Sequence, residues 1–574
     1  MAKKYCEIQK LIADPKSGKW WEDMKNIDDT KWKTMRHNGV LFADQYEPVP
    51  KKIKLLYEGK PVDVDSSNVK NKFNISAEEA AMFYAMKLEQ DERLKEKNKK
   101  RKLTADDTVF KRNFWTDWKY ILGSKHEIKS FEKVNFSQFQ KYISSRSEDK
   151  KFNLKAKSKD EKLELKEEKL ELKELYGYAI VDGVRIALGN YMIQPPGLYI
   201  GHGEHPLRGK IKRRIMPSDI TLNVSLKYIP KCNVDGKECK WGDVVENHEV
   251  TWIASWKHPI TDETNYVWLK REESHWVCAD DMEKFNKARS LKENIVSIRQ
   301  KYTKDLSSDN IQTNQLATAV YLLDSLAIRP GVDKDETKEA GTLGLTTLKC
   351  ENITFRNDNR TIVIDFVGKS SINFNKEFEV TKIVYANLKS LCKGKTSKDK
   401  IFPNITANTL NDYLKTLLIT LTAKVFRTYT ASNILQDQLN KTKVDIYEPT
   451  HQKKLTYDKV NIEVAKALNH KKLSEGDGKV EKLKLKIKEI KNKLKEAKTD
   501  AQKKTAQKSL DIQEAKLEET ELNISTSTSK VNYLDPRIVV SWCKSIEMPI
   551  EKIYNKTQLQ KFVWSMDVDP AWQF

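Results

Sequence analysis

The sequence predicts an α+β protein made of several domains. Apolar residues recur with helical spacing at 77–145, 281–330 and 405–472, whereas residues 177–274 and 342–385 are rich in β-branched and aromatic side chains. A length of 574 residues allows three or four domains of ordinary size. The 13 Trp, 21 Tyr and 18 Phe provide enough apolar surface for packed cores, which excludes an intrinsically disordered chain.

The chain is strongly basic, with a net charge of +22 and a pI of about 9.3. Such an excess of Lys and Arg indicates a polyanionic partner, because these side chains release counterions from a phosphate backbone when they bind it. The basic run Lys97–Lys102 fits a nuclear import signal. A solvated basic patch is the equally simple interpretation of this run.

The cysteines and the first residues indicate where the protein works. The seven cysteines are scattered, with no CxxC pair and no Cys/His spacing typical of zinc, so we expect a reducing compartment and no metal ligands. Residues 1–30 form a short polar lead without the apolar segment of a signal peptide, and no apolar run approaches 18 residues. We therefore expect a soluble intracellular protein with no membrane partner.

Three features stand out in the first half of the chain. Residues 31–75 read as loops and short strands, and the set Phe110, Phe114, Trp115 and Trp118 has the helical spacing of a core face. A seven-residue repeat, Glu-Lys-Leu-Glu-Leu-Lys-Glu, occurs twice within 161–174 and predicts a stiff, exposed helix or arm. The basic cluster at 210–217 suits phosphate contact.

Two narrow apolar stripes mark a linker in the second half. In both, apolar or small residues alternate with spacings of four and three residues on highly charged helices, and a break near Thr499 separates the two. The first stripe comprises Leu483, Ile487, Ile490, Leu494 and Ala497, and the second Ala506, Leu510, Gln513, Leu517, Thr520 and Ile524. This pattern predicts an antiparallel helical hairpin. The aromatic segment 530–574 is too small to fold well alone, so we expect it to dock on the preceding domain.

Tyr533 lies in a polar, basic setting, with Pro536 three residues on to stop a helix or strand. Read alone, Tyr533 is an ordinary packed aromatic. Five motifs, in register between about Lys31 and Phe574, give it another interpretation; they are Pro195–Leu198, Lys212–Pro217, Leu421–Tyr429, Asn532–Arg537 and Pro549–Lys556. Together these motifs resemble those of the eukaryotic type IB DNA topoisomerases.

The resemblance implies an enzyme that relaxes positive and negative supercoils. Such an enzyme cleaves one DNA strand through a 3′-phosphotyrosyl intermediate, lets the DNA rotate and religates the break. The phosphotyrosyl bond keeps the energy of the phosphodiester, so no ATP is expected. The implied partner is double-stranded DNA, bound by a monomer, with no obligatory metal and a divalent cation at most stimulatory. A P-loop and a cluster of carboxylates are both missing from the sequence, which agrees with this expectation.

The resemblance assigns five catalytic residues, which are Tyr533, Arg329, Lys369, Arg427 and His470. A tyrosine with a pKa near ~10 is a weak nucleophile at neutral pH. Two guanidiniums can hold the non-bridging phosphate oxygens and stabilise the charge of the transition state, and the histidine can donate a hydrogen bond to one of them. The lysine, on a turn, can protonate the leaving 5′ oxygen.

Each of these residues also has an ordinary structural interpretation. Arg329 and Arg427 lie beside apolar helical runs, where an arginine usually forms a structural ion pair. His470 could be a charge at the end of a helix, and Lys369 a solvated turn residue. Only their joint occurrence with the motif around Tyr533 favours catalysis.

The resemblance also implies DNA-binding residues and a bilobed clamp. The DNA-binding residues are Lys212, Arg213, Arg214, Lys424, Asn532, His202 and Ser370. The expected domains are the lead 1–30, a cap lobe 31–274 with projecting helices, a mainly helical catalytic lobe 275–472 that resembles tyrosine recombinases, an antiparallel coiled-coil linker 473–529, and a C-terminal segment 530–574 that carries the tyrosine.

The sequence departs from the family pattern at two places. The family commonly has Arg-Gly-Arg-Gly after Pro-Pro-Gly-Leu-Phe, where this chain has Tyr199–Gly203, and Asp just after the hairpin lysine, where this chain has Ser370. In the family those Arg and Asp positions pair beside the cleaved base step and contact camptothecin-type inhibitors. We therefore expect reduced sensitivity to these inhibitors.

Two other function classes fit part of the pattern. A tyrosine recombinase would use nearly the same residues but needs specific sites and synaptic partners, and the linker and cap motifs argue against it. A non-catalytic DNA clamp or architectural protein would bind DNA and leave no covalent adduct. We expect the nucleus as the location, with a cytoplasmic viral factory or a virion as the alternative if the source is a large DNA virus.

Overall fold

The computed structural model describes residues 30–97, 104–105, 107–234, 236–270, 275–335, 337, 339–358, 360–472 and 478–574. The predicted polar lead, except Thr30, and the basic run 97–102, except Lys97, lie outside these residues. The described chain mixes helices and sheets and divides into two compact units, an N-terminal unit (30–274 with 335–340) and a C-terminal unit (275–334 with 341–574). The prediction of a multidomain α+β protein is thus confirmed; the finer domain boundaries remain predictions.

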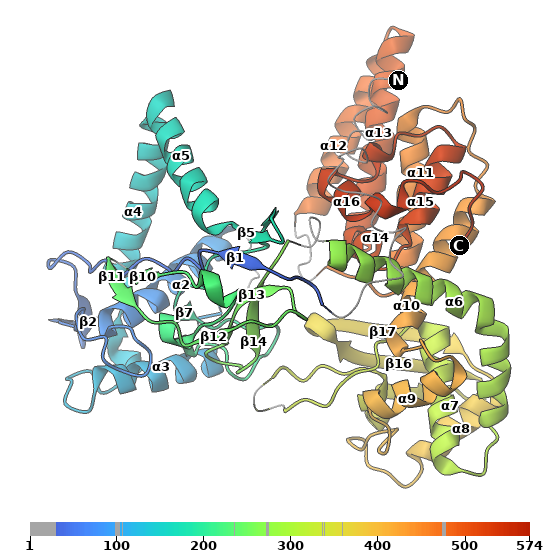
Figure 1. Ribbon diagram of the computed structural model, residues 1–574, viewed down its shortest axis with the longest axis horizontal. Coiled ribbons are helices and arrows are strands. Elements are labelled where there is room, and N and C mark those ends of the chain that lie inside the picture. Colours follow the sequence, from blue (N-terminus) through green and yellow to red (C-terminus); the bar gives the residue numbers. More distant parts are fainter. Residues whose placement is uncertain are drawn as a thin grey trace. The chain divides into compact units, whose positions relative to one another are not determined.

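The N-terminal unit combines short strands with four described helices (Figure 1). The helices are α2 (Ala77–Lys97), α3 (Thr108–Leu122), α4 (Ser137–Ala156) and α5 (Lys159–Tyr176). The strands are β1 (Met35–His37), β2 (Leu55–Tyr57), β3 (Lys60–Val62), β4 (Val134–Asn135), β5 (Tyr178–Val181), β6 (Val184–Ala187), β7 (Gly197–Leu198), β8 (Ile211–Lys212), β9 (Thr221–Asn223), β10 (Cys232–Val234), β11 (Lys237–Cys239), β12 (Asp243–Val245), β13 (Trp252–Lys257) and β14 (Thr264–Trp268). They form small sheets, the largest with the order β12-β9-β13-β14.

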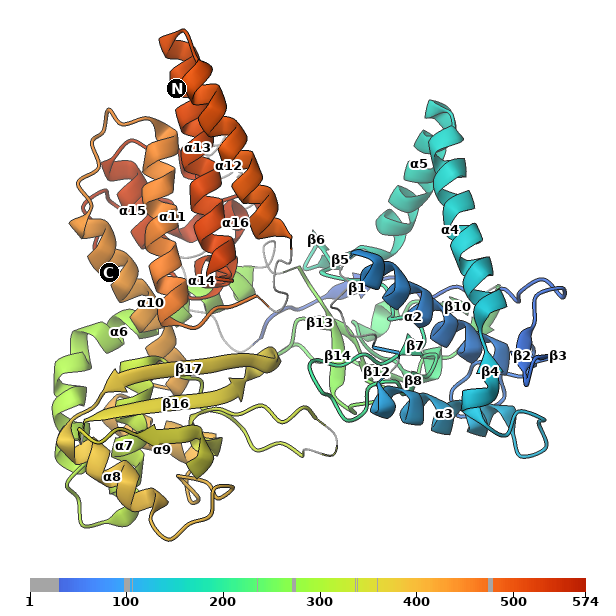
Figure 2. The same cartoon turned by 180° about the vertical axis from the view of Figure 1, so that it is seen from behind.

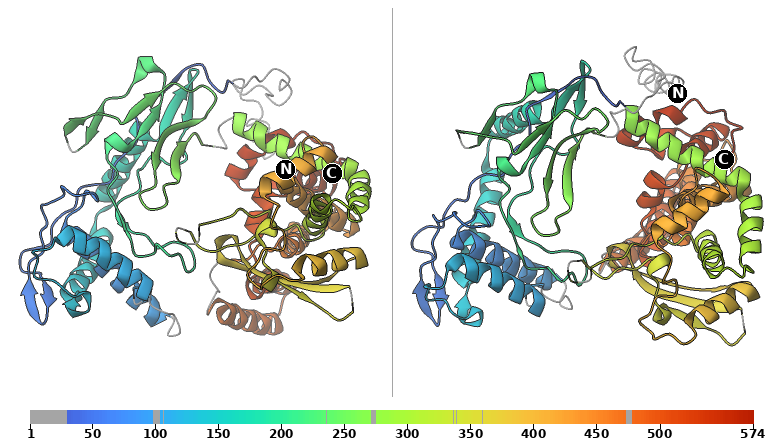
Figure 3. Two further views of the ribbon diagram at one scale, coloured as in Figure 1. Left: turned by 90° about the horizontal axis from the view of Figure 1, so that it is seen from below. Right: turned by 60° about the horizontal axis from the view of Figure 1, so that its bottom comes forward.

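The predicted aromatic face of α3 lies in a core. Phe110, Phe114 and Trp118 are fully buried with α2, and Trp115 packs at the edge of the same cluster. Figure 3 shows α2 and α3 in blue, side by side, with the green strands of this unit in a layer apart. The repeat at 161–174 forms α5, which begins with a capping box between Ser158 and Glu161 and is largely exposed along its length. The predicted stiff, exposed helix is thus confirmed.

The C-terminal unit is mainly helical around one three-stranded sheet (Figure 2). Its helices are α6 (His275–Asp305), α7 (Ile311–Leu326), α8 (Lys382–Cys392), α9 (Ala407–Leu417), α10 (Ala423–Lys441), α11 (Thr450–Ala467), α12 (Lys479–Glu496), α13 (Asp500–Glu521), α14 (Thr526–Asn532), α15 (Pro536–Ser545) and α16 (Lys556–Lys561). Its strands are β15 (Ile353–Phe355), β16 (Thr361–Gly368) and β17 (Ile372–Glu379), antiparallel in that order. Among the residues that the structure describes, no helix is long and apolar enough to cross a membrane.

One hydrophobic core joins α6–α11 to the C-terminal residues 534–574. Leu534, Val539, Tyr554 and Phe562 are fully or almost fully buried in the same cluster as Phe285 of α6. Burying several such side chains at about 25 cal/mol per Å² stabilises the docked position of this segment. The predicted docking of the C-terminal segment is thus confirmed.

The helices α12 and α13 form the predicted antiparallel hairpin (Figures 1 and 2). Ile487 and Ile490 pack against Leu510, and ion pairs join Lys484 to Glu521 and Lys491 to Glu514. Thr499 caps α13, at the predicted break. A narrow apolar contact between highly charged helices explains why the hairpin is an arm and not a globular domain.

The two ends of this hairpin are tied together where it joins the unit. The Lys472 N–H donates to the Asn523 carbonyl at 2.8 Å, and the Ser525 N–H donates to the His470 carbonyl at 2.8 Å. The Lys472 ammonium reaches Glu519 at 3.1 Å. The hairpin therefore leaves the unit and returns to it at one point, beside His470.

Candidate active site

Arg329 lies in a loop whose main chain makes a close contact that requires glycine at two positions. The helix α7 ends at Ala327, whose left-handed backbone turns the chain, and Pro330 favours an extended conformation of Arg329. Gly331 has φ +83°, and a Cβ on Gly344 would lie 2.4 Å from the Gly331 Cα and 2.8 Å from the Arg329 carbonyl oxygen. The two glycines thus let the main chains meet, which fixes the half-buried arginine at the end of the helix.

Lys369 lies at the tip of the β16–β17 hairpin, as predicted. The two strands pair along eight residues up to Gly368 and Ile372, and the turn uses left-handed backbones at Ser370 and Ser371. The Lys369 side chain is exposed. The regular strand pairing therefore places an exposed lysine at the edge of the site.

Arg427 and His470 form a buried pair. The Arg427 guanidinium, from the second turn of α10, donates to the carbonyls of Ala327 and Leu468 and to His470 Nε2, the last at 3.2 Å. This bond makes Nε2 an acceptor, so the proton of the neutral imidazole lies on Nδ1. The Arg427 Nε–H and His470 Nδ1 have no hydrogen-bond partner among the described residues. Two buried donors thus remain for a ligand that carries acceptors.

Tyr533 ends α14 and faces this pair. Its ring centroid lies 5.1 Å from that of His470, and the Arg427 Cζ lies 5.1 Å from the ring centroid. Pro536 opens α15 as its first residue, where its missing N–H costs nothing, and Asp535 caps that helix. The buried Asp535 carboxylate also pairs with Arg537 at 2.7 Å. The proline predicted to stop an element therefore starts the next one.

The charges of the two arginines shape the acid–base properties of the site. Burial alone would raise the pKa of Tyr533, but the positive charges of Arg427 and Arg329, together with hydrogen bonds to both side chains, outweigh burial, so the pKa is lowered from its ordinary value. Burial and the same two charges lower the pKa of His470 to about 3. Burial and the charge of Arg329 lower the pKa of Arg427 to about 10. At neutral pH the site therefore holds charged arginines and a neutral histidine.

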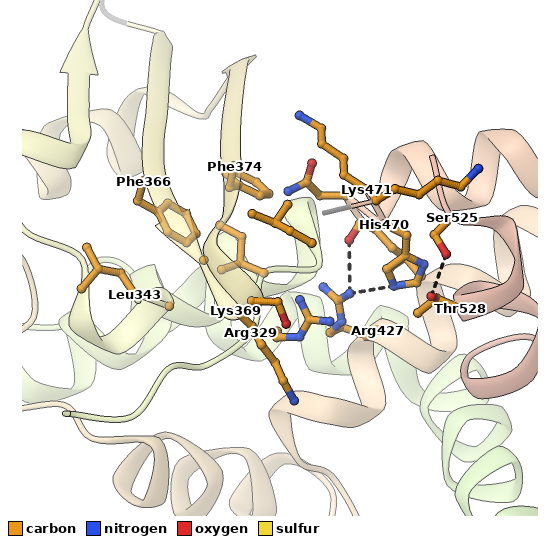
Figure 4. Close-up of a pocket in the computed structure, with 18 residues that line it drawn as sticks. Arg329, Leu343, Phe366, Lys369, Phe374, Arg427, His470, Lys471, Ser525 and Thr528 are labelled. Carbon is orange, nitrogen blue, oxygen red and sulfur yellow. Dashed lines mark hydrogen bonds between the residues drawn. The ribbon is translucent and has the colours of Figure 1, made fainter. Parts of the chain in front are cut away.

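A pocket of about 410 Å³ opens onto these residues (Figure 4). Arg329, Lys369, Arg427 and His470 all line it, and the ends of Arg329 and Arg427 lie close together next to the imidazole. None of its eighteen lining residues is acidic. Tyr533 is not one of the lining residues; its ring lies against His470 and Arg427, which are. The charge of the pocket therefore suits an anion.

Among the pocket residues that were not predicted as site residues, four come from the two ends of the linker hairpin. Lys471 and Lys472 precede it, and Ser525 and Thr528 follow it, with 3.0 Å between the two hydroxyl oxygens. The two lysines directly after His470 could have been predicted as phosphate contacts from the sequence. Ser525 and Thr528 could not, because serines and threonines are common in linkers.

The other predicted DNA contacts in the C-terminal unit lie around this pocket. Ser370 lines it. Lys424 is exposed on the first turn of α10, and Asn532 is exposed on α14, where its amide donates to the Thr528 carbonyl at 3.1 Å. Both are accessible to a ligand that approaches Tyr533 along α14 or α10.

The predicted contacts in the N-terminal unit differ in accessibility. Lys212 on β8 is half-buried, and burial lowers its pKa; His202 is exposed in a loop. Arg213 forms a two-pronged pair with Asp219 at 2.7 and 2.9 Å. Arg214 is buried, pairs with Glu79 at 2.8 Å and donates to two carbonyls. This geometry favours structural roles for both arginines, and phosphate binding by them remains a prediction.

Comparisons with known proteins agree over almost the whole chain. Family models match residues 30–269 (eukaryotic DNA topoisomerase I, DNA binding fragment), 273–501 (eukaryotic DNA topoisomerase I, catalytic core) and 484–574 (C-terminal topoisomerase domain). The chain is 37% identical to DNA topoisomerase 1 beta of Arabidopsis thaliana, over 98% of the chain and 62% of that protein. It is 36% identical to DNA topoisomerase 1 of Homo sapiens, over 96% of the chain and 73% of that protein. The chain thus spans about three fifths of the length of the plant relatives.

Proposed function

The chain belongs to the eukaryotic DNA topoisomerase I family, and from this premise we propose that it is a type IB DNA topoisomerase. It relaxes positive and negative supercoils by cleaving one strand, letting the DNA rotate and religating the strand. The gathering of Arg329, Arg427 and His470 beside the Tyr533 ring carries this proposal. Arg329 and His470, more than 100 positions apart in the sequence, thus lie in one pocket next to a tyrosine that suits the role of nucleophile.

In the proposed reaction the phenol oxygen of Tyr533 attacks the phosphorus of one phosphodiester. The phosphorus–oxygen bond to the 5′ oxygen breaks, and a 3′-phosphotyrosyl bond forms. The lowered pKa of Tyr533 supports this role, because it increases the fraction of phenolate available at neutral pH. Religation is the reverse attack by the 5′ hydroxyl and needs no ATP.

The phosphate oxygens would be held by the two arginines and His470. Charge that develops on these oxygens is stabilised most strongly by donors that are already in place and shielded from water. The unpartnered Nε–H of Arg427 and the imidazole N–H of neutral His470 are such donors. Lys369, at the hairpin tip, would protonate the leaving oxygen.

Duplex DNA is the proposed partner, bound by a monomer that clamps it between a cap lobe and a recombinase-like catalytic lobe. Lys424, Asn532 and Ser370, with Lys471 and Lys472, surround the pocket and suit phosphate contact, whereas Lys212 and His202 are the accessible candidates in the N-terminal unit. Phosphate contacts orient DNA and carry little sequence information, so we expect weak sequence preference.

The remaining parts of the proposal follow from the family. The α12–α13 hairpin is the coiled-coil linker, no obligatory metal takes part, and the protein works in the nucleus. Ile200, His202 and Ser370 replace the family's Arg and Asp positions that contact camptothecin-type inhibitors, which supports reduced sensitivity. A site that keeps its own charges unpaired for phosphate needs no metal to neutralise the anion.

Relaxation of a supercoiled plasmid in EDTA, without ATP, tests function, metal independence and ATP independence together. We expect complete relaxation by the parent chain, a covalent DNA adduct after denaturation, and neither with Tyr533→Phe. Recombinant products from paired specific sites would indicate a recombinase, and DNA binding without any adduct would indicate a non-catalytic clamp. Relaxation by Tyr533→Phe would refute the assignment of the nucleophile.

A further inference from the structure

A buried serine holds the main chain directly after Tyr533, on either side of Leu534. Ser432 lies on α10, five residues after Arg427, and its side chain is 0% exposed. Its hydroxyl donates to the Tyr533 carbonyl at 3.1 Å and accepts from the Asp535 N–H at 3.0 Å. The helix α10, which carries Arg427, is thus also hydrogen-bonded to the segment that carries Tyr533.

A second buried anchor acts on the other side of Tyr533. The Ser529 hydroxyl donates to Asn461 of α11 at 2.8 Å, and the Asn461 amide donates to the Thr526 carbonyl at 3.1 Å. The Ser529 carbonyl in turn accepts the N–H groups of Tyr533 and Leu534, at 2.9 and 3.1 Å. The last turn of α14 is therefore fixed to α11, the helix that leads to His470.

The two anchors connect the nucleophile to the anion-binding side chains through rigid elements. Ser432 and Ser529 are fully buried and Asn461 almost fully, so their hydrogen bonds compete with no water and would leave unsatisfied polar groups if broken. These three side chains cannot contact DNA themselves, because they are buried. Their role is therefore to hold the main chain near Tyr533.

We propose that Ser432 is a positioning residue for the Tyr533 nucleophile, with the Asn461–Ser529 pair as the second anchor. Ser432 sets the distance between the phenol and Arg427 by holding the carbonyl of Tyr533 and the amide of Asp535. The proposal deepens the function proposed above and rests on it.

Loss of the Ser432 hydroxyl releases both groups and lets the loop after Tyr533 shift. A displacement of about 1 Å at a reacting group costs roughly 100-fold in rate, because the attack geometry is lost before any bond changes. DNA affinity stays unchanged, since a buried hydroxyl contacts no phosphate.

The same shift has a signature in the pH dependence. The charged or titratable groups that face Tyr533 are Arg427 from α10, Arg329 from the loop after α7, and His470, which is neutral above pH 5. If the phenol moves away from the two guanidiniums, its pKa rises towards the ordinary value. Cleavage by the variant is then most impaired at low pH, and its rate profile moves to higher pH.

The test compares Ser432→Ala with Ser541→Ala in the full chain. Ser541 is a buried serine on α15 whose hydroxyl donates to the carbonyls of Pro570 and Trp572, so its loss removes buried hydrogen bonds without touching the Tyr533 main chain. Single-turnover formation of the covalent adduct is measured on a duplex oligonucleotide that cannot be religated, from pH 6 to 9.5. Binding is measured by fluorescence anisotropy, and folding by the melting temperature.

We expect Ser432→Ala to form the adduct about 100-fold more slowly at pH 7, with a profile moved to higher pH and unchanged DNA affinity, while Ser541→Ala stays near the parent. Ser529→Ala, which loses the second anchor, should show the same pattern and carries the test if Ser432→Ala does not fold. Adduct rates and profiles of both variants equal to those of Ser541→Ala would overturn the inference and leave the proposed function intact. A parent chain that forms no adduct would overturn the proposed function itself.

Discussion

The replacement Arg427→Lys gives the sharpest test of how the anion site works. Lysine keeps the positive charge but loses the planar fork of donors. In the structure three N–H groups of Arg427 bond to Ala327, Leu468 and His470, and the buried Nε–H has no hydrogen-bond partner among the described residues. The replacement therefore removes both the internal anchor and the free donor.

The size of the effect follows from the number of donors lost. Removal of one preorganised donor to a developing oxyanion costs about 10²–10³ in rate. A lysine ammonium has three N–H groups, and the carbonyls of Ala327 and Leu468 would compete for them. We therefore expect cleavage to slow by about 10³-fold, with DNA affinity changed by less than about threefold because the charge is retained.

The assay is single-turnover adduct formation at saturating enzyme, which separates cleavage from binding. Arg299→Lys is the control, because Arg299 is also fixed by several hydrogen bonds, in a two-pronged pair with Asp324 of α7 at 2.8 and 3.0 Å, and lies outside the pocket. A cleavage rate for Arg427→Lys within threefold of the control would refute a role for this guanidinium in transition-state stabilisation. A drop in both variants alike would indicate lost stability instead.

Three further predictions address stability, the linker and inhibitors. The pKa values of His37 and His470 are lowered, chiefly by burial, to about 4 and 3, so both are neutral in the folded chain at pH 5. In the unfolded chain, with pKa values of about 6.5, they bind protons, so stability should fall below about pH 6.5 by up to about 1.4 kcal/mol per pH unit for each histidine. His37→Gln should therefore flatten the dependence of melting temperature on pH. An equal slope in the variant would contradict this. Shortening α12 and α13 by matching turns should change the religation rate more than DNA affinity, since the hairpin joins the unit beside His470; an unchanged religation rate counts against it. Camptothecin should trap less cleavage complex than in a family member with Arg and Asp at the positions of His202 and Ser370, and full trapping at ordinary drug levels would contradict this.

The elements with strong periodicity could be predicted from the sequence. The spacing of Phe110, Phe114 and Trp118 gave a core face, and the stripes through Ile487 and Leu510 gave the linker hairpin, because apolar side chains at helical intervals must share a buried face. The short strands of the N-terminal unit could be placed only as a β-rich region, since runs of two to six residues carry little pattern.

The site was predicted less from chemistry than from its motifs. Nothing in the spacing of Arg329, Arg427 and His470 shows that they meet, because long-range contacts bring them together. Arg213 and Arg214 looked like phosphate contacts, but their carboxylate partners Asp219 and Glu79 could not be identified from sequence alone. The hydrogen bonds with which Ser432 and Asn461 hold the segment around Tyr533 could not be predicted either, because the sequence does not distinguish a buried serine or asparagine from an exposed one.

The position of Tyr533 within one shared core has a consequence for the order of folding. During synthesis Arg329, Arg427 and His470 emerge before the tyrosine, and the core that they frame stays incomplete until Leu534, Tyr554 and Phe562 arrive. A nascent chain can therefore acquire its anion-binding groups while it is still chemically inert. The proposed cleavage chemistry therefore requires the packing of this last segment, which places Tyr533 beside the anion-binding groups.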